Sequence, residues 1–367
     1  MSEESSTVAH LSVAMTTTGM TQITGTTSSS RGMIFYFRCA VVVIGVVGLA
    51  SNALVLYAIV ASKQHKKHIL IVNLNVLDLL SCLLLIVSYS LMLCNIHLSG
   101  SIGYWLCITL FSECLLSCSV AASVISLAMI TVERYLKVVY PVWSNNNLRD
   151  WMIYLATAFA WTYSIVLNFA IVLSTSTVID GVCYAYTFWK NETYSIFVLF
   201  FNFLSFYVVI LFIFIFCYWR ILSVIRRQAR VMAGHSGLPN SAPRSNAALT
   251  QSTQIQTNVI KTMILVSAFY AVSYLPNYIF ILLGTFGPRS LNSFFTIFGS
   301  GYYASVFVAF LYTCTNPFIY AIKFDPVKQA LLRLIPCKKT PEVDSHAGTR
   351  VNVATAGRCN NAWTSNT

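Results

Sequence analysis

Seven long apolar runs constrain this chain more than any other feature of its sequence. Each is long enough to cross the roughly 30 Å hydrocarbon core of a bilayer, which takes about 20 helical residues. Because lipid cannot satisfy backbone polar groups, runs of this length form helices, whereas barrel strands would be shorter and would alternate polar with apolar residues. The expected spans are Met33–Ala61, Ile69–Leu93, Cys107–Val132, Trp151–Leu173, Tyr194–Ile221, Val259–Phe286 and Phe294–Ile322.

The composition fits this interpretation. Of the 367 residues, 57% are hydrophobic and only 9% are charged, which is more apolar mass than one soluble core can enclose. The sequence therefore predicts an all-α membrane protein, a seven-transmembrane helix bundle over residues 33–322. Residues 1–32, most of 232–254 and 337–367 are rich in polar residues and are expected to be disordered. Residues 325–336 have one apolar face and predict a short amphipathic helix on the membrane surface.

Lysine and arginine mark one side of the predicted bundle. They follow the first span, lie between the fifth and sixth, and follow the seventh, and short loops rich in these residues stay in the cytoplasm. The N-terminus is therefore expected outside the cell, with the protein in the plasma membrane. The net charge of +12 reflects this topology and an attraction to anionic membrane lipid. Nucleic acid is not an expected partner, because no basic block is large.

Asp78 lies about 14 Å into the second span, near the middle of the membrane. A buried charge is costly there, so this carboxylate is a functional hypothesis. Asn52, Ser123 and Asn316 could meet it if the helices pack side by side. One carboxylate with several neutral oxygens would suit Na⁺ or a proton. Hydrogen bonding that only fixes helix packing is the alternative interpretation.

Several short motifs occur in a fixed order on successive spans. With them, the chain resembles the rhodopsin-like (class A) G-protein-coupled receptors over roughly residues 33–337. The resemblance implies an extracellular ligand and, as partners, a heterotrimeric G protein, receptor kinases and arrestin. No enzyme activity is expected, because no HExxH, GxSxG or paired-carboxylate arrangement occurs in a span. The motifs are "GLASN" with Asn52, "NLNVLDLL" with Asp78, "ERY" at Glu133–Tyr135 followed by Pro141, Trp161, Pro276, and "NPFIY" at Asn316–Tyr320.

The resemblance also assigns a switch at the cytoplasmic end. Arg134 would pair with Glu133 at rest and turn toward the G protein in the active state. Arginine stays charged at any accessible pH, so such a switch must change its partner and not its protonation. The other interpretation is an arginine that only reaches lipid phosphates. The implied switch residues are Glu133, Arg134, Tyr135, Pro141, Val142, Tyr218, Asn316, Pro317 and Tyr320.

Three modifications are suggested on or near the loops. The resemblance favours a disulfide between Cys107 and Cys183, although Cys94 could compete. Asn191 in "NET" is a candidate glycosylation site, whose occupancy the sequence leaves open. Cys337, beside two lysines, is a candidate palmitoylation site, and an unmodified cysteine is the alternative.

The chain departs from the family pattern at several positions. Tyr274 stands where tryptophan is usual, Ile210 where proline is usual, and Gln256 where an acid often pairs with the arginine. The missing acid is expected to raise basal signalling. From Cys107 to Arg134 there are 27 steps, two more than is typical, so a bulge or a shifted register is expected at the outer end of the third helix.

The ligand class depends on a few positions in the outer third of the bundle. Leu116 occupies the position of the amine receptors' aspartate, which argues against a monoamine, and Phe310 replaces the opsins' Schiff-base lysine. Glu113 could bind a cationic ligand group or could simply face water. A peptide ligand fits the aromatic, weakly acidic outer end of the bundle slightly better than a lipid does, and the sequence leaves both ligand classes open. The expected pocket residues are Glu113, Leu116, Ser117, Tyr274, Asn277, Tyr278, Tyr302, Tyr303, Val306 and Phe310.

Transport or conduction through the Asp78 cluster is the alternative function. Such a protein would need broken helices or paired charges along a path through the bundle. The sequence shows neither of these features. No cofactor is expected apart from an allosteric Na⁺ near Asp78.

Overall fold

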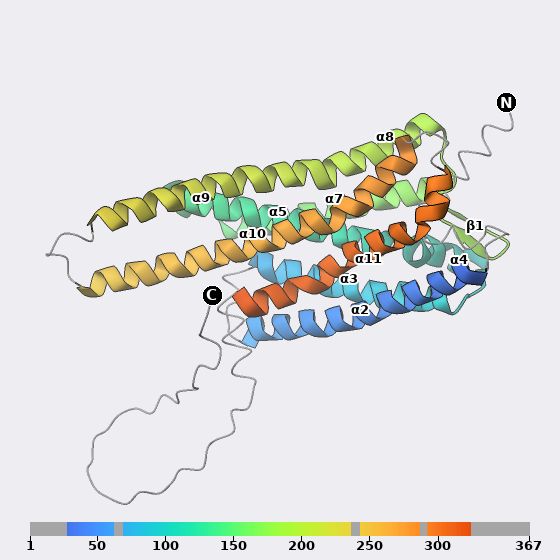
Figure 1. Ribbon diagram of the computed structural model, residues 1–367, viewed down its shortest axis with the longest axis horizontal. Helices are drawn as coiled ribbons and strands as arrows, with labels where there is room; N and C mark the ends of the chain where they lie inside the picture. The colour runs from blue at the N-terminus through green and yellow to red at the C-terminus, as the bar shows by residue number, and fades with distance from the viewer. Residues whose placement is uncertain (1–27, 62–68, 236–242, 287–291, 324–367) are drawn as a thin grey trace, which may run out of the picture.

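The computed structural model of the chain is an elongated bundle of helices (Figure 1). It describes residues 28–61, 69–235, 243–286 and 292–323, although some side chains within these ranges, including those of Gln256 and Tyr320, are not described. The predicted surface helix at 325–336, Cys337 and most of both predicted disordered ends lie outside the described residues.

Every predicted span corresponds to a helix of the structure, and the expected bundle of seven helices is confirmed. The fifth span is a continuous helix in three parts, α8, η4 and α9, of which η4 is π-helical. Two shorter helices, α4 (Gly100–Leu106) and α6 (Pro141–Asn147), lie outside the predicted spans, and the π-helix η3 (Cys107–Phe111) forms the outer end of the third span. The long helices are α2 (Ser28–Ala61), α3 (Ile69–Leu93), α5 (Cys114–Val139), α7 (Asp150–Thr175), α8 (Glu192–Phe203), η4 (Leu204–Val208), α9 (Val209–His235), α10 (Pro243–Phe286) and α11 (Asn292–Lys323).

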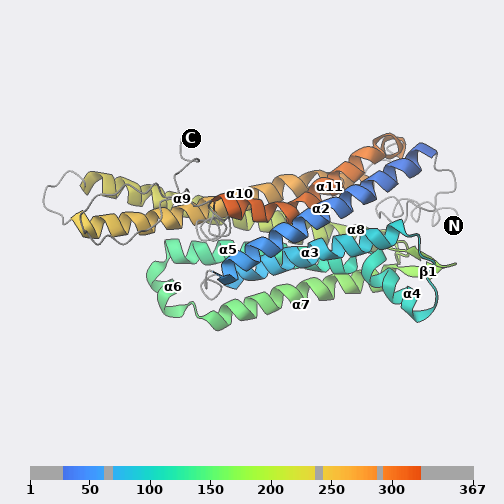
Figure 2. The ribbon, with the colours of Figure 1, turned by 90° about the horizontal axis from the view of Figure 1, so that it is seen from below.

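The expectation of disorder over most of 232–254 was wrong for the described part of that stretch, since residues 232–235 and 243–254 are helical. Helix α9 continues to His235 and α10 begins at Pro243, so the two helices extend well beyond the others at one end of the molecule (Figures 1 and 2). Proline suits the first turn of a helix, and the alanines and glutamines that follow have good helix propensity. The polar composition of this segment therefore marks a helix outside the membrane.

Six of the helical stretches are long and apolar enough to cross a membrane, judged on the described residues. They belong to α2, α3, the α4–η3–α5 stretch, α7, the α8–η4–α9 stretch and α10. Helix α11 is the seventh of the bundle and carries several buried polar side chains, including Thr313 and Asn316. The chain is a multi-pass membrane protein.

Helix α5 lies at the centre of the bundle and packs against α3, α7 and α9, while α2 packs against α3 and α11, and α11 against α10 (Figure 2). The buried apolar side chains form two large clusters. One includes Leu127, Ile130 and Tyr218, and the other includes Tyr89 and Phe111.

Two short hairpin strands close the end of the bundle opposite the α9 and α10 tips, and we call this the hairpin end (Figure 1). Strands β1 (Thr177–Ile179) and β2 (Val182–Tyr184) pair antiparallel through a turn at Asp180 and Gly181, both with positive φ. Cys183 on β2 forms a disulfide with Cys107, as the resemblance suggested, whereas Cys94 is free and exposed.

Candidate functional site

The end opposite the hairpin, which we call the Arg134 end, carries the predicted switch. Arg134 Nη2 lies 3.8 Å from Glu133 Oε2, so the expected pair is present but long. Lys137, one turn along α5, is closer, with Nζ 2.5 Å from Glu133 Oε1. Arg134 Nε has no hydrogen-bond partner among the described residues. The Glu133 carboxylate is therefore shared between two cations, and the sequence motif did not indicate the second one.

Tyr218 of α9 is buried close to this end. Its hydroxyl lies 2.9 Å from Thr131 Oγ1 of α5 and 3.0 Å from Ser267 Oγ of α10. In this conformation the phenol thus links three helices through neutral hydroxyls, and no bond joins it to Arg134. Tyr320, the second tyrosine of the predicted switch, lies outside the described side chains.

Helix α6 (Pro141–Asn147) follows α5 directly at the Arg134 end. Proline occupies its first turn, where a missing backbone N–H costs nothing. Val142 is 74% exposed, and Trp143 beside it is also exposed. Tyr135 packs edge-on against Tyr140 with ring centroids 5.8 Å apart. The predicted docking residue is therefore an exposed apolar side chain on a short rigid helix.

The Asp78 cluster forms as predicted for two of its three partners. Ser123 Oγ donates to Asp78 Oδ1 at 2.7 Å, and Asn316 Nδ2 donates to Asp78 Oδ2 at 2.8 Å. All three residues are fully buried. The carboxylate therefore joins α3, α5 and α11. Hydrogen bonds to a charged group are each worth about 1.5–3 kcal/mol, so this contact favours a single arrangement of the three helices.

Asn52 does not bond to Asp78, contrary to the prediction. Its Nδ2 donates to Gly48 O at 3.0 Å and to Thr313 O at 3.2 Å, so it ties α2 to α11 instead. The Oδ1 atoms of Asn52 and Asn316 have no partner among the described residues, although both side chains are buried. The two Oδ1 atoms, one on α2 and one on α11, can therefore each still accept a hydrogen bond or bind a cation.

Trp161 of α7, one of the motif residues, takes part in a polar chain. Its Nε1 donates to Asn73 Oδ1 at 3.2 Å, and Asn73 Nδ2 donates to Ser126 Oγ at 2.9 Å. The chain fixes α7 and α3 against α5.

Glu113 occupies a break in the third span. The π-helix η3 (Cys107–Phe111) ends just before it, and α5 begins just after it, so the expected bulge is confirmed. The backbone of Glu113 is left-handed, with a φ of 58°, and this conformation costs a non-glycine residue roughly 1–2 kcal/mol. Tyr89 donates its hydroxyl to Glu113 Oε1 at 2.8 Å, and Ser117 N donates to Glu113 O at 2.8 Å. Strain at an acidic side chain near a membrane surface indicates a functional constraint.

Arg38 of α2 is a residue that the sequence reasoning missed. It is only 7% exposed, and its Nη1 donates to Met92 O at 2.8 Å. Glu113, Tyr89 and Tyr303 lie close enough to act on its charge. A charged residue inside a span is unusual, so an arginine within the first apolar run was the signal that could have found it.

The remaining predicted pocket residues fall into two groups. One surrounds the Glu113 region, where Tyr303 and Phe310 of α11 pack with Tyr89 of α3 in one apolar cluster. The other is aromatic and belongs to α10, where Tyr278 packs against Tyr207 of η4 and Tyr274 packs against Tyr312 of α11. Leu116 and Val306 join the first group, and the Asn277 Oδ1 atom is buried without a partner among the described residues.

The second group extends through a ladder of tyrosine rings. Tyr270 and Tyr274 have ring centroids 5.0 Å apart, and those of Tyr278 and Tyr207 are 4.9 Å apart. Tyr207, within η4, also donates its hydroxyl to Ala271 O at 2.9 Å. The π-helical turn ends two residues before Ile210, so this span is irregular at the place where the family has proline. The ladder connects η4 to α10 and includes Tyr274, which stands where the family usually has tryptophan.

Asn191 is exposed at the hairpin end and is the N-cap of α8. Its Oδ1 accepts a hydrogen bond from Tyr194 N at 2.7 Å. The side chain of the predicted glycosylation site therefore also holds the start of a helix.

The chain is similar to known membrane receptors. A family model described as "7 transmembrane receptor (rhodopsin family)" matches residues 51–320. The chain is 22% identical to galanin receptor type 1 of Rattus norvegicus, over 85% of this chain and 86% of that protein. It is 24% identical to somatostatin receptor type 5 of Bos taurus, over 80% of this chain and 74% of that protein.

Among solved structures, squid rhodopsin is similar with a TM-score of 0.67 and 16% identity, over 82% of this chain and 84% of that chain. At this identity the similarity bears on the fold alone. The arrangement of the helices is therefore that of a known seven-helix fold.

Proposed function

We infer that this chain, which belongs to the rhodopsin family of seven-transmembrane receptors, binds a ligand at the hairpin end and activates heterotrimeric G proteins at the Arg134 end. The observation that carries the proposal is the arrangement of Glu133, Arg134 and Lys137. Glu133 is held closely by Lys137 and only loosely by Arg134, so the guanidinium is poised to leave its carboxylate partner. The match to a receptor family gives no support to a transport function.

Partner exchange explains why two opposite charges lie together at this end. Arginine remains charged whichever group it faces, so its position and not its protonation distinguishes two states. When Arg134 leaves, Lys137 still neutralises Glu133, which lowers the cost of the exchange. Val142 is exposed on α6 beside this site and would make an apolar contact with the G protein.

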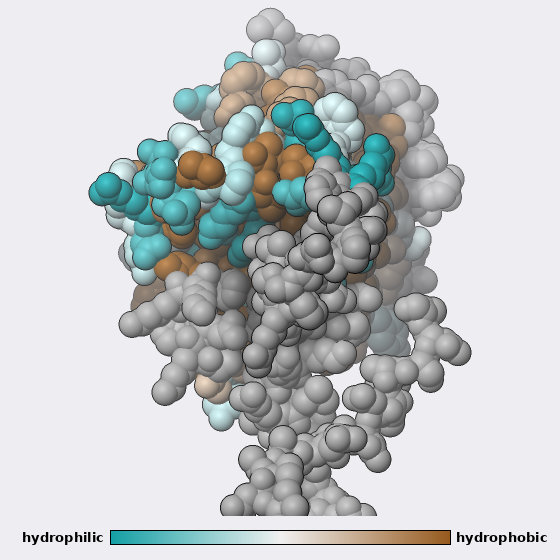
Figure 3. Space-filling view, turned by 90° about the vertical axis from the view of Figure 1, so that its left-hand side faces the viewer, coloured by the Kyte–Doolittle hydropathy of each residue, from teal (hydrophilic) through white to brown (hydrophobic). Residues whose placement is uncertain are grey.

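Charge supports a cytoplasmic location for the Arg134 end. The exposed basic side chains of Arg220, Arg226, Arg227 and Arg230 on α9, and of Lys261 on α10, lie toward it. Hydrophilic side chains also gather on this face of the molecule (Figure 3). We therefore place the N-terminus and the hairpin outside the plasma membrane, and we propose that arrestin and receptor kinases act at the same end as the G protein.

For the ligand we propose a peptide with a cationic group. The galanin and somatostatin receptors, which the chain resembles over most of its length, are named for peptides. Glu113 would bind the cationic group, with Tyr89 orienting its carboxylate. Retinal is not proposed as the ligand despite the similarity in fold to squid rhodopsin, because Phe310 stands where opsins have the lysine that binds retinal.

Sodium is proposed as an allosteric ligand of the Asp78 cluster. The donor set would be the Asp78 carboxylate, the Ser123 hydroxyl and the orphaned Oδ1 atom of Asn316, and hard cations prefer such oxygens. Asp78 would supply the charge, and the neutral oxygens would replace part of the hydration shell.

A peptide screen with G-protein dissociation as the readout tests the proposal. Cells expressing the wild type are expected to respond to at least one cationic peptide, and cells expressing Arg134→Ala at equal surface level are expected not to respond. Glu113→Gln should shift the same response to about tenfold higher peptide concentration, the loss expected for one desolvated charge pair. An equal response from Arg134→Ala would contradict the switch. An unshifted response from Glu113→Gln would contradict the assigned ligand contact.

A further inference from the structure

Two cysteine thiols face each other in the interior of the bundle. Cys82 of α3 and Cys314 of α11 have Sγ atoms 3.8 Å apart, and neither takes part in a disulfide. Cys82 is 0% exposed and Cys314 is 5% exposed. Neither residue belongs to the switch, the Asp78 cluster or the ligand pocket, so their juxtaposition has no role in the proposed function.

The surroundings hold the two sulfur atoms together. Cys314 Sγ donates to Ile44 O of α2 at 3.2 Å, and Asn52 Nδ2 donates to Cys82 Sγ at 3.7 Å. Gly48 of α2 provides the space. A Cβ atom at this position would lie 2.5 Å from Cys314 Sγ and 2.6 Å from Cys82 Sγ. The two sulfur atoms thus pack against α2 in space that only a glycine at position 48 leaves to them.

We propose that Cys82 and Cys314 are a redox modification site, at which a membrane-soluble hydroperoxide oxidises both thiols to a disulfide that links α3 to α11. A disulfide has an S–S distance of about 2.05 Å, so the sulfurs must approach by roughly 1.8 Å. Rotation of the two Cα–Cβ bonds together with a small helix shift supplies such a movement.

The reaction balances with one hydroperoxide for each pair of thiols. The first sulfur attacks the terminal oxygen of the hydroperoxide, the O–O bond breaks, and an alcohol leaves with the thiol proton. The resulting sulfenic acid is attacked by the second sulfur, which forms the S–S bond. Its hydroxyl departs as water with the second proton. Two electrons pass from the thiols to the peroxide, and no other reactant is required.

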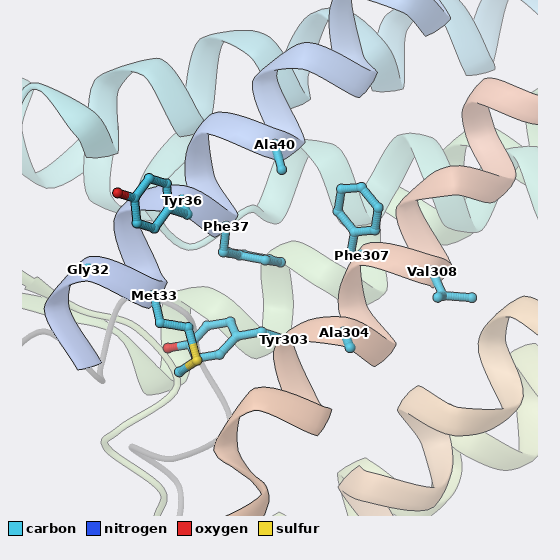
Figure 4. Close-up of a pocket in the computed structure, with 9 residues that line it drawn as sticks. All are labelled: Gly32, Met33, Tyr36, Phe37, Ala40, Tyr303, Ala304, Phe307 and Val308. Carbon is cyan, nitrogen blue, oxygen red and sulfur yellow. The ribbon is translucent and has the colours of Figure 1, made fainter. Parts of the chain in front are cut away.

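An apolar groove near the thiols gives such an oxidant a place to bind from the membrane. It has a volume of about 810 Å³ and lies between α2 and α11, with Phe37 and Ala40 on one side and Phe307 on the other (Figure 4). Ile44, the hydrogen-bond partner of Cys314, is one helical turn or about 6 Å beyond Ala40 along α2. A lipid-soluble peroxide can therefore partition close to the thiols, whereas a charged oxidant cannot.

The disulfide would restrain the helices on both sides of the Asp78–Asn316 contact. Cys82 is one turn from Asp78 on α3, and Cys314 is two residues before Asn316 on α11. Any movement of α11 against α3 would then strain the new bond. This consequence for signalling rests on the proposed function, whereas the formation of the disulfide does not.

Mass spectrometry tests the site directly. The full-length protein in lipid nanodiscs is treated with cumene hydroperoxide, denatured, alkylated and digested without reduction. We expect a peptide pair linked through Cys82 and Cys314 and a loss of alkylation at both. Cys82→Ser and Cys314→Ser are expected to abolish the link. Cys114→Ser, which removes another buried thiol on α5, is the matched control and should leave the link intact. Full alkylation of both thiols after treatment would overturn the proposal.

Two further measurements test the geometry and the consequence. Gly48→Ala should prevent the link, because its Cβ occupies the space of the two sulfurs, and the serine variants decide the matter if this variant does not fold. Oxidation should lower peptide-stimulated nucleotide exchange in the wild type and leave Cys314→Ser unchanged. A link without any effect on exchange would contradict the restraint. If neither the wild type nor any variant catalyses nucleotide exchange, the proposed function fails. The mass spectrometry still decides whether the disulfide forms.

Discussion

Lys137 Nζ lies 2.5 Å from Glu133 Oε1, whereas Arg134 Nη2 lies 3.8 Å from Glu133 Oε2. The closer cation is thus the one that the receptor motif does not include. Glutamate four residues before lysine is the favourable order for an ion pair on a helix. Lys137 therefore competes with Arg134 for the carboxylate that would keep the receptor at rest.

Removing Lys137 should strengthen the resting pair. The Lys137 side chain is 42% exposed, and such i,i+4 pairs are worth about 0.3–0.5 kcal/mol. Lys137→Ala is therefore expected to lower basal nucleotide exchange on the G protein roughly twofold, while Lys137→Arg, which keeps the charge, should change it little. Glu133→Gln should have the opposite effect, because Arg134 then loses its carboxylate. Increased basal exchange in Lys137→Ala would contradict the competition.

The left-handed conformation of Glu113 predicts a conflict between stability and ligand binding. Glycine adopts a φ of 58° without strain, so Glu113→Gly should be about 1 kcal/mol more stable than Glu113→Ala, which loses the same carboxylate and its hydrogen bond from Tyr89 but keeps the strain. The same change removes the carboxylate and should weaken binding of a cationic peptide. Glu113→Gln is the control, since it removes the charge and keeps the strain. Thermal unfolding in detergent measures the first effect, and a midpoint for Glu113→Gly that is equal to or lower than that of Glu113→Ala would count against it.

Sodium should stabilise the protein through Asp78. A ligand that binds only the folded state adds about 1.4 kcal/mol of stability at a concentration ten times its dissociation constant. Replacing choline chloride by NaCl at constant ionic strength is expected to raise the unfolding temperature of the wild type but not of Asp78→Asn. Ser81→Ala is a matched control, because Ser81 is also buried on α3 and its hydroxyl bonds to Leu77 O and Ser119. An equal sodium effect in wild type and Asp78→Asn would place the cation elsewhere.

Asn191 should have two separable roles. Thr193→Ala removes the glycosylation motif but leaves the Asn191 cap on Tyr194 N, whereas Asn191→Ala removes both. We expect both variants to lose the mobility shift produced by glycosidase treatment of the wild type. Only Asn191→Ala should also lose about 1 kcal/mol of stability through the missing cap. Equal stability of the two deglycosylated variants would show that the cap contributes nothing measurable.

The sequence predicted the helices well because length and hydropathy leave a membrane chain few alternatives. The extra residues between Cys107 and Arg134 even predicted an irregular outer third helix, and η3 and Glu113 provide it. The prediction failed where disorder was inferred from polar composition alone. The polar stretch after Met232 contained the end of α9 and the beginning of α10.

Side-chain partners were harder to predict than helices. Asp78 met Ser123 and Asn316, but Asn52 turned to backbone oxygens of α2 and α11, because the rotation of α2 about its axis cannot be read from one sequence. Arg38 was overlooked although its charge alone marked it. The contact of Cys82 with Cys314 depends on the space that Gly48 leaves, which appears only when three helices are packed.

The central claim is that Arg134 couples the bundle to a G protein. The most direct test measures nucleotide exchange on a purified heterotrimeric G protein by the purified chain in lipid nanodiscs, with Arg134→Ala and Lys137→Ala beside the wild type. We expect exchange catalysed by the wild type, reduced basal exchange with Lys137→Ala, and none above background with Arg134→Ala. Equal exchange by the wild type and Arg134→Ala would contradict the central claim.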